Sequence, residues 1–184
     1  VALAKLAVEH SPTPLDRAGA QHNLGLVLLE QALRLPLEQS KNGMKNALSA
    51  YEAALTVSTE TAHPELWAAT ENNRGNALHN LASRLGPDEV DEARRLLEES
   101  VACYDAALAV RTKDRAPNDW AITQNSKGNA LSQMGIISDG PEREAAFSKA
   151  ISAHDNALTV HTQERHADDW AAAQNNKANA LSLL

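Results

Sequence analysis

One block of twelve residues recurs four times along the chain at nearly constant spacing. It begins at Trp67, Trp120 and Trp170, and a weaker copy with arginine in the first place begins at Arg17. The four starts are 50, 53 and 50 residues apart, and every tryptophan of the chain stands at the first position of a copy. A fixed period of this size predicts a helical repeat array, whose core extends along one dimension, and not a single globular domain.

A second type of helix alternates with these blocks. Three stretches, starting at Met44, Leu97 and Phe147, carry mostly apolar residues at i, i+3, i+4, i+7, i+10 and i+11, the stripe of an amphipathic helix. We name the helices of the tryptophan blocks A helices and the alternating ones B helices, which gives an all-α order B-A-B-A-B-A-B-A. The expected repeat units are residues 15–60, 65–112 and 118–162, with incomplete ends at 1–10 and 168–184. The chain starts at Val1 without methionine, so we expect one repeat array that is a fragment of a longer chain.

Local signals predict several boundaries and contacts. Residues 1–10 read as the end of a B helix, a helix is expected from about Leu15 to Arg34, and Pro36–Gly43 reads as a loop. The three extra residues of the 53-residue interval are assigned to the connection from an A helix to the next B helix. A charge inside an apolar stripe is costly unless it is paired. The recurring 22-residue separation of opposite charges therefore predicts three A-to-B ion pairs: Glu52–Arg74, Asp105–Lys127 and Asp155–Lys177.

Composition and missing motifs exclude several functions. A net charge of −7 argues against binding to nucleic acid, and no apolar run is long enough to cross a membrane. The single cysteine, Cys103, cannot form an internal disulfide and is read as a small core residue, which fits a cytoplasmic protein. The seven histidines lack the spacing of a metal site, and no nucleophile elbow, phosphate-binding loop or dinucleotide fingerprint is present. We therefore expect no enzymatic activity, no metal and no cofactor.

The motif N-x-x-G-N-A-L, followed by a B helix of the form A-x-x-Y-x-x-A-L, resembles the tetratricopeptide repeat. The matching residues are Gly75, Ala77, Leu78 with Tyr104, Ala107, Leu108, and Gly128, Ala130, Leu131 with Ala157, Leu158. The long period makes the chain most similar to the kinesin-light-chain type and to bacterial multi-repeat proteins, although the repeats of the family are usually about 34 residues long. The resemblance implies a right-handed α-solenoid of antiparallel helix pairs, with the A helices lining a concave groove.

The resemblance also implies where a ligand would bind. Polar residues on the side of the A helices opposite the core would face the groove, and an amide side chain can both donate to and accept from a bound peptide backbone. The candidate ligand-binding residues are His22, Asn72, Asn76, His79, Asn125, Asn129, Gln133, Asn175 and Asn179. The alternative is that the asparagines bond neighbouring A helices to each other or face water.

Three functions remain open at this point. The first is a module that binds a peptide or protein segment in the groove. The second is a scaffold that self-associates as a homo-oligomer through uncapped ends, where Leu181 and Leu184 would be uncovered beside Trp170. The third is a sensor or scaffold segment of a larger bacterial protein with its catalytic domain elsewhere. The tryptophans are expected to be structural and to cover the end of the preceding B helix.

Overall fold

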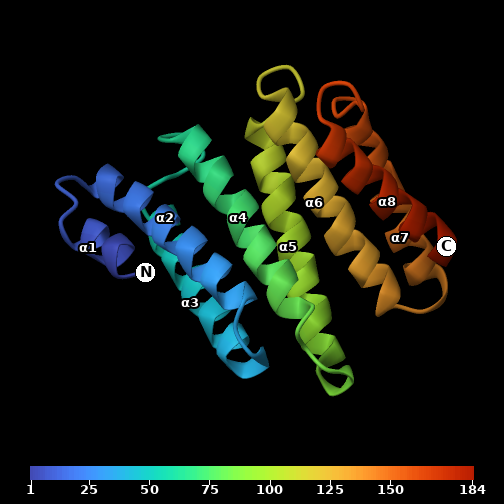
Figure 1. The fold of residues 1–184 in the computed structure, drawn as a ribbon, viewed down its shortest axis with the longest axis horizontal. Coiled ribbons are helices and arrows are strands. Elements are labelled where there is room, and N and C mark those ends of the chain that lie inside the picture. The colour runs from blue at the N-terminus through green and yellow to red at the C-terminus, as the bar shows by residue number, and fades with distance from the viewer.

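The computed structural model describes residues 1–184, which form eight α-helices and no strand (Figure 1). The all-α prediction and the alternation of B and A helices are therefore confirmed. The B helices are α1 (Ala2–Glu9), α3 (Leu37–Leu55), α5 (Val90–Val110) and α7 (Gly140–Leu158). The A helices are α2 (Pro14–Leu33), α4 (Pro64–Ala82), α6 (Pro117–Ile136) and α8 (Ala167–Leu183).

Proline marks the start of three of the four A helices. Pro14, Pro64 and Pro117 occupy the first helical position, where the missing N–H costs nothing and the fixed φ angle suits the helix. At α2 the Thr13 side chain also accepts a hydrogen bond from the Asp16 backbone N–H at 3.1 Å. The A helices thus begin close to the predicted positions.

The prediction of a loop over Pro36–Gly43 is wrong, because α3 already begins at Leu37. Gly43 suggested a break, but the residue lies inside the helix, where α2 and α3 approach closely. A β-carbon built at Gly43 would stand 2.7 Å from the Ala32 β-carbon. This glycine therefore serves helix packing and does not end a helix.

The insertion lies where the spacing predicted. Residues 83–89 connect α4 to α5 and include a short 3₁₀ helix, η1 (Pro87–Glu89), whereas only residues 137–139 connect α6 to α7. Because the extra length is confined to this connection, the apolar stripes of the flanking helices keep their relative phase.

Each A helix packs most extensively against the B helix that follows it, which gives the pairs α2–α3, α4–α5 and α6–α7. Each later A helix also contacts the preceding B helix and the preceding A helix, whereas the backbones of consecutive B helices do not approach each other closely and only side chains such as Arg94 and Glu142 meet between them. Neighbouring elements of a curved array lie closer together on its inner side. The A helices therefore line the inner side of the array, and the two chain ends lie at its opposite ends (Figure 1).

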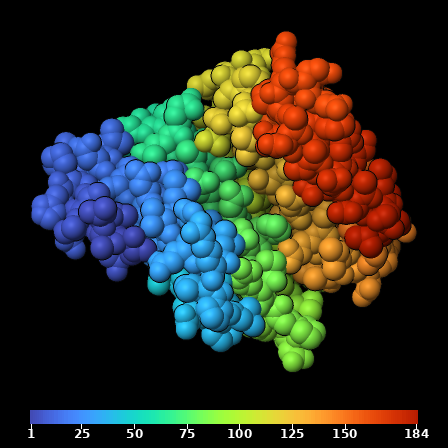
Figure 2. All heavy atoms as spheres, in the orientation of Figure 1, coloured from blue at the N-terminus to red at the C-terminus, as the bar shows by residue number.

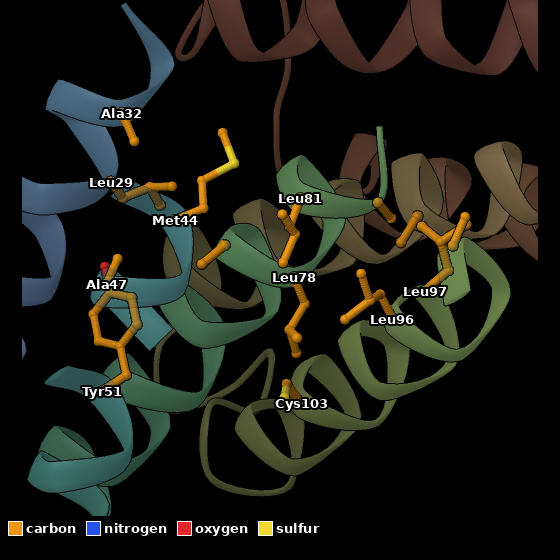
Figure 3. Packing of buried hydrophobic residues seen from close by; sticks show 14 of the residues in the cluster. Leu29, Ala32, Met44, Ala47, Tyr51, Leu78, Leu81, Leu96, Leu97 and Cys103 are labelled. Carbon is orange, nitrogen blue, oxygen red and sulfur yellow. The ribbon is translucent and has the colours of Figure 1, made fainter. Parts of the chain in front are cut away.

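A glycine on each of α2, α4 and α6 receives a ring from the following B helix. A β-carbon built at Gly25 would stand 2.4 Å from the ring of Tyr51, and Gly75 lies in the same way against Tyr104. The main core extends from α2 to α6, and Figure 3 shows Met44 of α3 between α2 and α4. Since each repeat contributes to a continuous core, the pairs stabilise one another along the array.

Two of the three predicted ion pairs are present. Lys127 Nζ lies 2.5 Å from Asp105 Oδ1, and Lys177 Nζ lies 2.7 Å from Asp155 Oδ1. The prediction for Arg74 is wrong, because its guanidinium pairs with Glu71 and Glu99, and Glu52 takes no part.

Trp67 packs against a small apolar cluster that includes Ala107 and Val110 near the end of α5, the B helix that follows it, whereas the prediction named the end of the preceding B helix. The two helices of a pair are antiparallel, so the start of α4 meets the end of α5. Cys103 is buried in the core, and this burial raises the pKa of its thiol, so it is not poised as a nucleophile.

Candidate functional site: the inner face of the A helices

The inner surface of the A helices is rich in amide side chains and carries no charge over three helices. We define the A face by four equivalent positions in each of α4, α6 and α8 that span about 60° of the helix circumference. These residues are Ala69, Asn73, Asn76 and Asn80; Ile122, Ser126, Asn129 and Gln133; and Ala172, Asn176, Asn179 and Leu183. All twelve are at least partly exposed. Figure 2 shows this side hollowed between α2 and α8.

Beside the A face, a ladder of polar contacts joins successive A helices. His22 Nδ1 lies 3.0 Å from the Thr70 hydroxyl oxygen, and the next rung places the Thr123 hydroxyl 3.0 Å from Asn72 Oδ1. In the third rung, Asn176 Nδ2 donates to Asn125 Oδ1 at 3.4 Å. The ladder thus connects α2, α4, α6 and α8. His22, Asn72 and Asn125 stand at equivalent positions, and so do their partners Thr70 and Thr123, but the third rung uses Asn176 because Ala173 replaces the threonine in α8.

The structure divides the nine predicted site residues into three groups. His22, Asn72 and Asn125 belong to the ladder, and Asn72 is only 6% exposed, so its amide is not accessible to a peptide. Asn76, Asn129, Gln133 and Asn179 lie on the A face. The remaining two, His79 and Asn175, lie beside the A face. Asn175 is equivalent to the ladder residues Asn72 and Asn125, but it is exposed because no A helix follows α8 in the structure.

The A face has a cavity between α6 and α8. The cavity, of about 280 Å³, is lined by Asn129, Gln133 and Asn179. The Gln133 side chain bonds to His79, whereas the amides of Asn129 and Asn179 take no part in the hydrogen bonds of the fold. Ile136 and Leu183 add exposed apolar surface beside them. The hydroxyl oxygen of Ser132 in the same cavity is buried and unpartnered. Unused hydrogen-bonding groups next to apolar surface are what a binding site needs.

A change on the neighbouring B helix leaves Asn129 free. In the preceding repeat the Tyr104 hydroxyl donates to Asn76 Oδ1 at 2.8 Å. His154 replaces this tyrosine in α7, and its Nδ1 lies 2.8 Å from Asn125 Oδ1. The shorter ring therefore uses the ladder asparagine and leaves the Asn129 amide without the bond that Asn76 has.

Burial keeps the histidines around this surface neutral. Desolvation lowers the pKa of His22, with a smaller effect from the charge of Arg111. Desolvation also lowers the pKa of His79, which the Gln133 side chain partly opposes. Near neutral pH, His22 and His79 therefore add no positive charge beside the A face, and the A face itself carries none.

Other kinds of site have no support in the structure. No group of three or more histidine, cysteine, aspartate or glutamate side chains is placed to hold a metal ion. None of the helices is both long and apolar enough to cross a membrane. Compared with protein-family models and with curated proteins, the chain gives no match. The function therefore has to be inferred from the surfaces of the array.

Sequence reasoning missed Asn73, Asn80 and Asn176. Each directly follows a selected residue, namely Asn72, His79 or Asn175. The selection took the direction opposite the core of one isolated helix. An A helix within an array also has an A helix on each side, which buries positions such as Asn72 and shifts the open face. The recurrence of polar residues at equivalent positions, Asn73, Ser126 and Asn176, is the signal that could have revealed this face.

Proposed function

We propose that the array is a tetratricopeptide-type, right-handed solenoid that binds an extended peptide segment of another protein on the A face. The packing of Gly75 against Tyr104 supports the family resemblance, because it brings together two of the matching motif residues. The observation that carries the proposed function is the cavity between α6 and α8, with the unpartnered amides of Asn129 and Asn179.

The chemistry of this cavity suits a peptide backbone better than a charged ligand. Amide side chains offer both donors and acceptors, and a peptide presents the same two groups at every residue. The apolar side chains of Ile136 and Leu183 can cover part of a ligand without requiring a specific charge. Binding of this kind depends mainly on the ligand backbone, so its sequence preference should be broad.

The test is a peptide-array screen that compares the unaltered protein with Asn129→Ala plus Asn179→Ala. Each lost hydrogen bond weakens binding by about 0.5–1.5 kcal/mol, so the double variant should bind its peptides about tenfold less tightly. The melting temperature should stay unchanged, because these amides have no partner within the fold.

Asn175→Ala is the matched control, since it removes an exposed amide from α8 outside the cavity. Equal binding by the double variant and the unaltered protein would show that the A face is not the site. Lower stability with unchanged binding would assign these asparagines a structural role.

A second candidate function is self-association through α8. Leu181 and Leu184 are 52% and 55% exposed, and Leu183 is also uncovered. Apolar residues gathered on one helix favour contact with another protein surface.

A further inference from the structure

The B side of the array carries an open groove between α5 and α7, with α6 as its floor. Two adjoining cavities of about 480 Å³ and 540 Å³ share Glu98 of α5, Leu131 and Met134 of α6, and Lys149 of α7. Along α5 the groove extends from Arg94 to Asp105, a length of about 17 Å at 1.5 Å per residue. This surface is separate from the A face and lies on the opposite side of α6.

The equivalent place between α3 and α5 is filled by a side chain. Arg74 extends there from α4 and pairs with Glu71 and with Glu99 of α5. Its side chain is only 20% exposed, and its guanidinium joins α4 to α5.

Two residue differences between the repeats keep the groove between α5 and α7 open. Lys149 occupies the position equivalent to Glu99, and Gln124 the position equivalent to Glu71. Lys127, the equivalent of Arg74, therefore has no carboxylate on α7 to reach and pairs with Asp105 on α5 instead. The open groove is thus a consequence of how this repeat differs from the preceding one.

Most charges along the groove are already paired. Arg94 lies 3.7 Å from Glu142 and donates to the Ser138 hydroxyl oxygen, and the other pair is Lys127 with Asp105. Two exposed charges remain without an ion-pair partner within 4.0 Å: Glu98 on the α5 wall and Lys149 on the α7 wall. Between them lies an apolar floor that includes Leu131 and Met134.

We propose that this groove binds an extended acidic peptide segment of a partner protein, with a large apolar side chain on Leu131 and Met134 and a carboxylate against Lys149. At about 3.3 Å per residue, a groove of about 17 Å holds roughly five residues. Glu98 repels the carboxylate from the α5 wall and so fixes which side of the peptide faces α7. Because the whole chain carries a net charge of −7, general attraction does not hold an acidic peptide, and binding depends on Lys149.

The experiment uses an array of random heptapeptides, probed with the unaltered protein and with Lys149→Glu. The substitution reproduces the glutamate of the preceding repeat and gives Lys127 a carboxylate across the groove, so it should close the groove without harming the fold. Lys45→Glu is the matched control, because it changes the net charge equally at an exposed position of α3.

The unaltered protein should enrich peptides that carry an aspartate or glutamate within three residues of a large apolar residue. Lys149→Glu should reduce their affinity at least tenfold, and Lys149→Ala should also weaken it, whereas Lys45→Glu should not. Asn129→Ala plus Asn179→Ala should leave this binding unchanged, which separates the groove from the A face. Absence of such enrichment, or equal losses in Lys149→Glu and Lys45→Glu, would overturn the proposal.

Discussion

Tyr51 and Tyr104 occupy equivalent core positions but differ in what their hydroxyl groups bond. Both side chains are fully buried, and burial raises the pKa of both phenols. The Tyr104 hydroxyl donates to Asn76, whereas the Tyr51 hydroxyl has no partner. The reason lies on the A helix: Leu26 stands in α2 at the position that Asn76 holds in α4.

This difference predicts opposite effects of the same substitution. Tyr104→Phe should lower the free energy of unfolding by about 1 kcal/mol, the usual net value of one hydrogen bond. Tyr51→Phe should raise it by about 1 kcal/mol, because it removes a buried hydroxyl whose lost hydration is not compensated. For a chain of this size, the melting temperature should fall by about 3 °C in the first variant and rise by about 3 °C in the second.

Urea unfolding followed by circular dichroism measures both free energies, and parallel slopes would show that the two variants unfold in the same way. A double-mutant cycle with Leu26→Asn adds a direct check. The new amide should couple favourably, by about 1 kcal/mol, with Tyr51 and not with phenylalanine at that position. Equal destabilisation by Tyr51→Phe and Tyr104→Phe would refute the reasoning, since it would mean that the Tyr51 hydroxyl is satisfied in solution.

Three further predictions concern pH, ion pairs and association. Desolvation lowers the pKa of His154 to about 4, so below pH 6.5 the unfolded chain binds a proton at this residue more readily than the folded chain does. The free energy of unfolding should therefore fall as the pH drops from about 6.5 towards 4. In urea titrations at several pH values, His154→Tyr should show a weaker fall. Asp105→Asn should cost about 0.5 kcal/mol in low salt and less in 1 M salt, whereas Glu52→Gln, which breaks no ion pair, should unfold at the same urea concentration as the unaltered protein. Sedimentation at rising concentration should show association of the unaltered protein that Leu181→Glu plus Leu184→Glu reduces; a monomer at all concentrations would contradict the second candidate function.

The architecture could be predicted from the sequence because it depends on local patterns that repeat. The repeat period predicted the order of the helices. The apolar stripes of the flanking helices keep their phase, which predicted that the insertion lies in a connection, and it lies in residues 83–89. The loop predicted over Pro36–Gly43 failed because a glycine that permits close helix contact resembles a glycine that ends a helix. That distinction depends on the neighbouring helix, which local sequence does not reveal.

The candidate site was harder to predict, because it depends on which faces the neighbours leave open. Asn72 and Asn76 are one turn apart on the same helix, yet one joins the ladder and the other lies on the A face. Arg74 shows the same limit, since Glu71 and Glu99 compete for it in a way that the 22-residue spacing does not include. Comparison of equivalent positions between repeats carries more of this information than any single helix does.

The unequal spacing on the two sides of the array has a mechanical consequence. The backbones of successive A helices approach closely and their side chains are bonded to each other, whereas the backbones of successive B helices lie farther apart and few side chains, such as Arg94 and Glu142, meet between them. Each junction can therefore act as a hinge whose axis runs along the A–A contact, with free space only on the outer side. Bending that narrows the outer gaps should meet little resistance, while bending that compresses the inner ladder should be stiff. The array should thus behave as a spring with a preferred direction of flexing, so that its curvature changes more easily in one sense than in the other.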